Sequence, residues 1–361
     1  MSRLSLESYL KLERLCCPGC RVPLSYVADV LACAVCGTAY EVANGIPVLL
    51  PPDTRRSETK ATMQRFWGEL YEAAYAGHVE EHDRAAFLAL LAELEHMFRY
   101  RRHLAVTEMP IDELAGKAVL EIGSGAGAHS ALFAERGAEM TSMDITPERV
   151  VATATKLDWV STGGHFALQA DAERLPFGEA RFDIVYSNGV LHHTPDTAQA
   201  VAEVGRVLKP GGRAVVMLYA RHSVQYWVNL FFLHGVLRGA MLRRPGWLGP
   251  ATEWMATQPQ RTLNPETKVF SGHEVRRLFR DFREVKIRKN SFTYGMALNV
   301  LHWVPRLGPR FAAAILRHLG RRMPLSRGGI LVYGAPWRLE TPLELALGRW
   351  IGFGLNIVAV K

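Results

Sequence analysis

Residues 118–127 read AVLEIGSGAG, and this stretch decides the fold class. Its first half is largely apolar, which predicts a buried parallel strand. Gly123, Gly125 and Gly127 follow, and glycine lets the backbone turn sharply and approach a ligand closely at the start of a helix. We therefore expect a strand, a glycine-rich turn and a helix that continues through Arg136, with a ligand bound at the turn.

Strands and helices alternate beyond this turn. Four more strands are expected at 139–143, 166–169, 182–186 and 213–219, and the first of these runs into Asp144. A helix from about 196 to 208 precedes the fifth strand, and residues 284–288 and 355–360 predict the sixth and seventh strands. The pattern predicts an α/β protein with an open, doubly wound, Rossmann-like sheet of seven strands, whose ligands bind at the carboxyl ends of the strands.

All five cysteines lie in the first 36 residues, and four of them form two C-x2-C pairs, Cys17/Cys20 and Cys33/Cys36. Each pair places two thiolates on one tight turn, and two such turns supply the four sulfur ligands that Zn2+ prefers. The spacing predicts a small zinc ribbon with a structural metal, because four thiolates leave the metal no open position. Iron bound by the same four thiolates, and disulfides, are the alternatives.

Between the ribbon and the glycine-rich turn, residues 51–58 are rich in proline, serine and charge, which predicts a linker. Phe87, Leu91, Leu94 and Phe98 then recur at three- and four-residue steps, which predicts an amphipathic helix packed on the core. Residues 100–102, Tyr-Arg-Arg, end this helix. They either reach a ligand carboxylate or face solvent.

The net charge of +8 is unevenly distributed: residues 221–361 carry +15 and residues 1–220 carry −7. Two apolar, aromatic and basic insertions, about 221–267 and 292–353, are expected to form a helical cap over the carboxyl ends of the strands. The second contains the apolar run 311–316 followed by Arg317, His318, Arg321 and Arg322. Such segments are typical either of interfacial helices at an anionic membrane or of a closed hydrophobic lid.

Neither a secretory signal nor a spanning helix is expected, because the first fifteen residues lack an apolar core and the most apolar run, 226–237, is interrupted by Asn229 and His234. We expect a cytoplasmic protein, with peripheral contact at the inner face of the membrane as an open alternative. The oligomeric state is not predicted by these patterns.

The chain resembles class I S-adenosylmethionine (SAM)-dependent methyltransferases, in the group that methylates quinones and sterols. The motifs that carry the resemblance are LEIGSGAG (120–127), Asp144, DAERLPF (171–177), FDIVYSNGVLHH (182–193) and VLKPGG (207–212). The cysteine region resembles zinc ribbons fused ahead of several such enzymes, including a guanine-methylating rRNA group. The resemblance divides the chain into a zinc ribbon (1–52), a linker with N-terminal helices (53–116), a SAM-binding core (117–220), a first cap insertion (221–267), more core (268–291), a second cap insertion (292–353) and the last core strand (354–361).

The resemblance also implies roles for single residues in binding SAM. Gly123, Gly125 and Gly127, with Ser124 between them, would line the methionine part, and Glu121 would hold the glycine loop or the amino group. Asp144, followed by Ile145, would bind the ribose hydroxyls. Asp171 and the Ala172 backbone would bind adenine, and Asn188 would lie near the sulfonium.

A base is needed only when the accepting atom carries a proton, because the sulfonium is already an activated leaving group. His192 and His193 follow the fourth strand, and histidine titrates in the useful range, so either is a candidate general base. Tyr219, at the end of the fifth strand, is a further candidate.

The acceptor is expected to be a small or amphipathic, lipid-like molecule methylated at O, N or C. RNA methylation at a ring nitrogen or a ribose is the alternative, although Ser-Asn-Gly-Val follows the fourth strand where many exocyclic-nitrogen methyltransferases carry Asn/Asp-Pro-Pro-aromatic. No cysteine occurs after Cys36, which removes the usual nucleophile for cytosine C5. A non-catalytic SAM-binding scaffold recruited by its ribbon and a nicotinamide-dependent oxidoreductase are the remaining alternatives.

Overall fold

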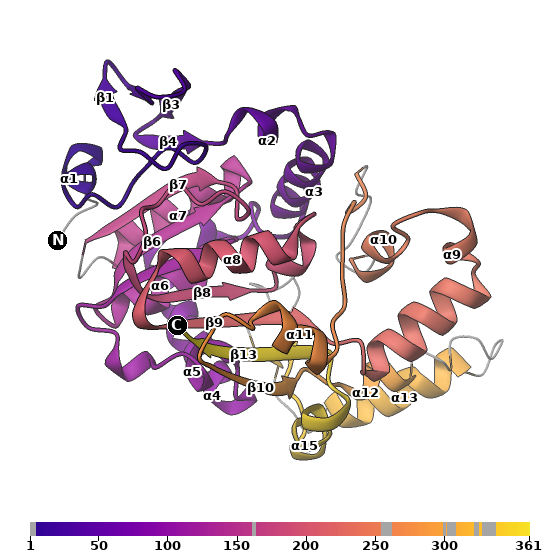
Figure 1. The fold of residues 1–361 in the computed structure, drawn as a ribbon. Helices are drawn as coiled ribbons and strands as arrows, with labels where there is room; N and C mark the ends of the chain where they lie inside the picture. The colour runs from indigo at the N-terminus through magenta and orange to yellow at the C-terminus, as the bar shows by residue number, and fades with distance from the viewer. Residues whose placement is uncertain are drawn as a thin grey trace.

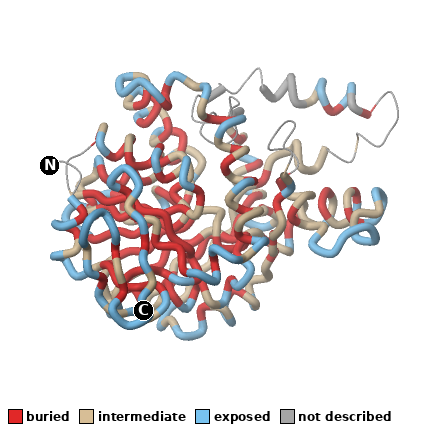
Figure 2. Tube along the Cα trace, turned by 90° about the horizontal axis from the view of Figure 1, so that it is seen from above, coloured by how far each residue is buried: buried red, intermediate tan, exposed pale blue. Residues whose placement is uncertain are grey.

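The computed structural model describes residues 5–160, 164–253, 262–298, 301, 308–320, 325–326 and 337–361. One twisted sheet runs through the molecule, with helices on both faces, the cysteine region at one edge and the cap helices beyond the carboxyl ends of the parallel strands (Figure 1). The buried residues gather along the strands of this sheet (Figure 2).

The seven predicted core strands are all present, and they lie side by side in the order β7 (His165–Ala170), β6 (Glu139–Asp144), β5 (Ala118–Ile122), β8 (Phe182–Asn188), β9 (Leu208–Tyr219), β13 (Gly354–Val360) and β10 (Glu284–Asn290). The first five are parallel, whereas β13 is antiparallel to both of its neighbours. The Rossmann-like, seven-stranded sheet is therefore confirmed. The order of strands reverses at β5, which is where ligands bind in open sheets of this type.

Helices cover both faces of the sheet, as a doubly wound fold requires. One face packs against α4 (Arg84–Arg101), α6 (Ala128–Glu135) and α7 (Pro147–Val160), and the other against α8 (Thr197–Val207) and α11 (Gly272–Leu278). The predicted amphipathic helix is α4, and its Phe87, Leu91, Leu94 and Phe98 are all buried. The other helices before η4 are α1 (Leu6–Lys11), α2 (Pro52–Arg56), α3 (Glu58–Ala74), η1 (Val79–Glu81), α5 (Leu104–Thr107), η2 (Ile111–Glu113) and η3 (Leu191–His193). The predicted linker contains the short helix α2.

The strands of the cysteine region extend the core sheet, so this region is not a separate appended unit. Its strands β1 (Ser25–Val27), β2 (Val30–Ala32), β3 (Ala39–Ala43) and β4 (Ile46–Leu49) form an antiparallel meander, and β4 pairs in parallel with β7. The described sheet consequently has 11 strands. The sequence predicts the meander but not its pairing with the core, because register between distant segments leaves no local pattern.

The cap consists of the helices that project beyond β9 and β10 (Figure 1). These are the π-helix η4 (Gln225–Leu237), α9 (Ala240–Arg243), α10 (Leu248–Thr252), α12 (Tyr294–Leu298), α13 (Gly308–Gly320) and α15 (Pro342–Ile351), with β11 (Leu325–Ser326) and β12 (Trp337–Arg338) as a separate pair. Arg321 and Arg322, which the sequence places on the basic rim of the second insertion, lie outside the described residues, as do the side chains of Arg317 and His318. None of the helices in the described ranges is both long and apolar enough to cross a bilayer.

Candidate active site

A cavity of about 370 Å³ opens at the carboxyl ends of the core strands. It is lined by ten of the residues that the sequence singled out: Gly123, Ser124, Gly125, Asp144, Ile145, Asp171, Ala172, Asn188, His193 and Tyr219. Residues of α3, α4 and both cap insertions complete its walls. Glu121, Gly127 and His192 are not among the described residues that line it.

The glycine loop has the conformation that the sequence predicts, and two of its glycines are required by close approach as well as by backbone angles. Gly123 has a φ of 75°, and a Cβ there would lie 2.2 Å from a methyl carbon of Val190. Gly127, with a φ of 86°, begins α6, and its Cβ would lie 2.7 Å from the Cα of Thr153 on α7. Gly127 thus lets α6 and α7 pack closely, while Gly123 and Gly125 face the cavity.

Asp144 ends β6 at the wall of the cavity. Its Oδ2 accepts a hydrogen bond from the Gly125 amide at 3.0 Å, and its Oδ1 accepts one from the Thr146 amide at 2.9 Å. A carboxylate offers about four acceptor positions, so two remain for hydroxyl donors. This arrangement fits the predicted binding of a ribose diol, and it also ties the glycine loop to β6.

Asp171 follows β7 and is bonded by side chains from the N-terminal helices. The Lys60 ammonium and the Thr54 hydroxyl both donate to its Oδ2, and Lys60 also pairs with Glu173 at 2.7 Å. Burial alone would lower the pKa of Lys60, but the two carboxylates outweigh burial and raise the pKa above its ordinary value. Among the described residues, Asp171 Oδ1 accepts only from the Glu173 amide, so the carboxylate keeps capacity for an amino donor such as adenine.

Glu121 is buried behind the glycine loop. Its carboxylate accepts a hydrogen bond from the Ser130 hydroxyl on α6, and the His129 ring lies 3.6 Å away. These contacts fit the predicted role of holding the loop, whereas His129 itself lines the cavity.

The two histidines after β8 occupy different positions. His192 is fully buried beneath Tyr219, with ring centroids 3.8 Å apart, and burial lowers its pKa well below the ordinary value. His193 lines the cavity, and its Nδ1 lies 3.0 Å from the Glu266 carbonyl, which fits an Nδ1–H donor. Burial lowers the pKa of His193 to about 4, so the ring is neutral near pH 7.

Glu253, from the first cap insertion, was not predicted as a site residue. Its Oε1 accepts a hydrogen bond from the Tyr219 hydroxyl at 3.1 Å and lies 3.7 Å from Nε2 of His193. The side chain is buried and lines the cavity. A lone glutamate within a loop carries no sequence signal, since only the fold brings it to Tyr219.

Arg101 reaches the cavity from the end of α4, but its partner there is a protein carboxylate and not the ligand carboxylate that one of the two readings of residues 100–102 expects. It pairs there with Glu340 of the second cap insertion, with N–O separation of 2.7 Å. Glu340 is buried and its Oε2 has no hydrogen-bond partner within the described ranges. Like Glu253, Glu340 was not foreseen.

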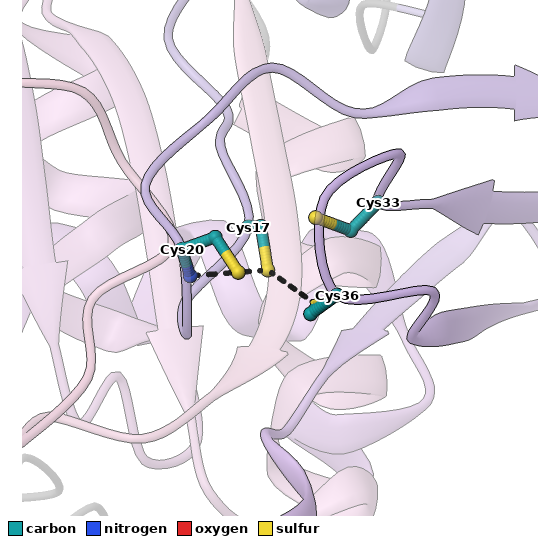
Figure 3. A group of neighbouring side chains, drawn as sticks. All are labelled: Cys17, Cys20, Cys33 and Cys36. Atoms are coloured by element: carbon teal, nitrogen blue, oxygen red, sulfur yellow. Dashed lines mark hydrogen bonds between the residues drawn. The ribbon is translucent and has the colours of Figure 1, made fainter.

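The four cysteines that the sequence predicts as metal ligands lie close together in space. The strands of their region belong to the same sheet as the strands that end at the cavity. The sulfur atoms of Cys17, Cys20, Cys33 and Cys36 all lie within 4.8 Å of one another. Two come from the turn after Leu15 and two from the turn after β2, and they face each other (Figure 3). Four thiols so close together are the donor set of a tetrahedral zinc site, so the residues fit the predicted metal.

Replacing Asp144 with alanine tests the cofactor assignment. We expect Asp144→Ala to weaken binding of S-adenosylhomocysteine (SAH), the demethylated form of SAM, by about 100-fold or more, because two charge-assisted hydrogen bonds to the ribose are lost. Isothermal titration calorimetry measures the affinity. Asp281→Ala, at a side chain that is 88% exposed, is the matched control and should bind normally. An Asp144→Ala protein with wild-type affinity would contradict the assignment.

Comparison with known proteins agrees with this site. Residues 120–216 match a family model described as a methyltransferase domain. An uncharacterized methyltransferase of Synechocystis is 30% identical over 182 residues, which cover 49% of this chain and 77% of the relative. The demethylmenaquinone methyltransferase of Thermobifida fusca is 31% identical over 136 residues, covering 38% of this chain and 58% of that protein. A ubiquinone biosynthesis O-methyltransferase of Idiomarina loihiensis is 29% identical over 167 residues, covering 45% and 62%.

The chain spans less than two thirds of the length of the last two relatives. The residues that match the family model include β6, β7 and β8, most of β5 and β9, and the loops that carry the glycines, Asp144 and Asp171. The chain therefore belongs to the SAM-dependent methyltransferases.

Proposed function

We propose that this methyltransferase acts on a small, lipophilic acceptor that presents a hydroxyl group to Glu253. The observation that carries the proposal is the buried contact of Glu253 with Tyr219 and His193 at the wall of the cavity. When bound, SAM supplies the methyl group on a sulfonium that is already a good leaving group.

The lining of the cavity favours a lipophilic acceptor. Apolar and aromatic side chains from α3 and the residue after it, from α4, from the core and from α12 line the cavity: Met63, Trp67, Leu70, Tyr75, Leu94, Phe98, Met143, Met217 and Met296. Cavities of this kind bind apolar ligands and use a few polar groups to orient them. Glu253 and Glu340 are such groups, because both are buried carboxylates at the wall.

Glu253 is the group placed to take a proton from the acceptor. Burial lowers the pKa of His193 to about 4, so its ring is neutral near pH 7, and its Nδ1 lies 3.0 Å from the Glu266 carbonyl. The Tyr219 hydroxyl donates to Glu253, which fixes the carboxylate at the cavity wall. A hydroxyl that approaches Glu253 can pass its proton to the carboxylate as its oxygen takes the methyl group. In this proposal Tyr219 orients Glu253.

The relatives are consistent with such an acceptor. One is named for demethylmenaquinone and another for O-methylation in ubiquinone biosynthesis, so both names refer to lipophilic quinones or their precursors. The family model covers residues 120–216, whereas Glu253 and Glu340 stand in the cap insertions. We therefore propose a hydroxylated, lipophilic ring as the class of acceptor.

The acceptor class can be tested with methyl-labelled SAM. We expect the purified chain, incubated with a lysate, to place label in the organic extract, because the cavity favours lipophilic molecules. Label is then counted separately in the organic extract, in RNA and in the remaining aqueous material, with Asp144→Ala as the blank. Label in RNA alone would establish the nucleic-acid alternative, and bound SAH without transfer to any fraction would favour the scaffold.

The role of Glu253 can be tested in the same assay. We expect Glu253→Gln to lower the rate of transfer by roughly 10²- to 10⁴-fold, because the amide cannot accept the proton. SAH affinity should stay within about threefold of wild type, since no charge-assisted bond to the cofactor is assigned to this residue. Glu266→Gln is the matched control, since Glu266 lies on the same loop and pairs with Lys268 at 3.4 Å. Wild-type rates in Glu253→Gln would exclude it as the base.

We further propose that the cap contacts an anionic membrane through η4 and α9. Trp227, Phe232 and Leu237 are each about half exposed on η4, and Leu242 on α9 is 93% exposed. Residues 221–252 contain four arginines and no Asp or Glu, and Arg243 and Arg244 beside Leu242 are exposed. Apolar side chains flanked by arginines fit the interface of an anionic bilayer. The Asn229 amide of η4 donates to the Met296 carbonyl at 2.8 Å, so this surface adjoins a residue of the cavity wall.

Sedimentation with vesicles tests the membrane contact. We expect the protein to pellet with phosphatidylglycerol-containing vesicles more than with phosphatidylcholine vesicles, and less at high salt. The double change Arg243→Glu, Arg244→Glu should weaken binding by about 10-fold or more, since each arginine near the surface contributes about 1 kcal/mol. Arg276→Glu, Arg277→Glu on α11 is the control. Equal pelleting with both kinds of vesicle would overturn the proposal.

A further inference from the structure

The loop that carries Asp171 is held by the segment that carries the first cysteine pair. Leu15 forms an antiparallel bridge with Phe177, the Cys16 amide donates to the Pro176 carbonyl at 2.9 Å, and the Gly178 amide donates to the Arg14 carbonyl at 2.9 Å. These backbone contacts lie immediately before Cys17. The position of residues 176–178 is therefore tied to the position of the turn that carries Cys17 and Cys20. We call this turn the first knuckle and the turn that carries Cys33 and Cys36 the second knuckle.

A side chain makes a second connection between the knuckle and this loop. Arg21, one residue after Cys20, donates to Oε1 of Glu203 at 2.9 Å, and Oε2 of Glu203 accepts from the Leu175 amide at 3.0 Å. Arg206 also pairs with Glu203 at 2.7 Å. Arg21 thus contacts the loop through Glu203. When Arg21 is replaced, Glu203 still has Arg206 as a positively charged partner.

The other end of the cysteine region reaches the same loop from β4. Val48 pairs with Gln169 and Leu49 with Ala170, the residue before Asp171. The chain then runs directly into α2 and α3, whose Thr54 and Lys60 donate to the Asp171 carboxylate. Leu31, Tyr40 and Leu49 of the cysteine region share one hydrophobic cluster with residues of β7 and the loop, among them Ala172, Leu175 and Phe177.

We propose that metal binding at the four cysteines and cofactor binding at Asp171 are energetically coupled. Metal at the cluster fixes both knuckles and β4, and through them it fixes residues 171–178 with Lys60 and Thr54 in place. By reciprocity, cofactor bound at Asp171 makes the cluster retain its metal more strongly. Lys60 is the positioning residue at the cofactor end, and Arg21 is a connection at the metal end. The inference rests on the proposed assignment of Asp171 to adenine.

The experiment measures zinc transfer from the zinc-loaded full chain to a coloured chelator, with and without saturating SAH. We expect SAH to reduce the transfer of zinc at equilibrium by about 5- to 150-fold, the usual range for two coupled sites. The Asp144→Ala chain, which should bind SAH about 100-fold more weakly or worse, is the control and should show no effect at an SAH concentration that just saturates the wild type. Unchanged zinc transfer in a wild-type chain that binds SAH would overturn the coupling alone. A wild-type chain that fails to bind SAH would overturn the cofactor site and the coupling with it.

Variants separate this coupling from a general stabilisation by the ligand. Lys60→Met should keep its zinc but lose most of the SAH effect at saturating SAH, and Lys60→Arg should restore it. Should Lys60→Met fail to fold because Asp171 and Glu173 face each other uncompensated, Arg21→Ala gives the same test. Its side chain is half exposed, and Glu203 retains Arg206. A full SAH effect in Arg21→Ala and in a folded Lys60→Met would show that the coupling does not pass through these contacts.

Discussion

The parallel pairing of β4 with β7 is the constraint on which the rest of the structure depends. Two residue pairs, Val48 with Gln169 and Leu49 with Ala170, join the meander of the cysteine region to the edge of the core sheet. An uncovered edge strand invites pairing with other chains, so the meander also protects β7. Because β4 leads directly into α2 and α3, this pairing determines where Thr54 and Lys60 enter the cavity. The cofactor side of the site is therefore built partly by residues before the core.

Buried ion pairs also connect the helices before the core to the cavity. Within the described residues, three ion pairs bring one charge from the N-terminal helices to the wall or the loop behind it: Lys60 with Asp171, Glu81 with Lys156, and Arg101 with Glu340. Lys156 also donates to the Ala126 carbonyl of the glycine loop at 2.6 Å. Removing one partner of a buried pair costs about 3–5 kcal/mol, because the other charge is left uncompensated. These pairs fix the geometry of the site more than they add stability.

The sequence predicted the parts of this protein that depend on local patterns. The strand boundaries of the core, the glycine turn, the cysteine pairs and the acids at the ends of β6 and β7 all follow from periodicity, turn chemistry or recurring motifs. Lys60, Glu253 and Glu340 could not be found in this way, since each becomes part of the site only when distant segments meet. The pairing of β4 with β7 escaped prediction for the same reason: two residues of register leave no signature in either strand.

The residues at the ends of the core strands and the residues of the cap insertions also differ in how far they can be substituted without loss of the fold. Asp144 and Asp171 stand at the ends of core strands, where their carboxylates accept hydrogen bonds from backbone amides of the adjoining loops. Glu253 and Glu340 stand in insertions that cover the sheet but contribute no strand to its described core. With the roles proposed above, a change of acceptor asks for changes in the insertions, while Asp144 and Asp171 at the ends of the strands keep the cofactor site. This division explains how one sheet can serve many acceptors, and why the acceptor of this chain is best sought from the residues around Glu253.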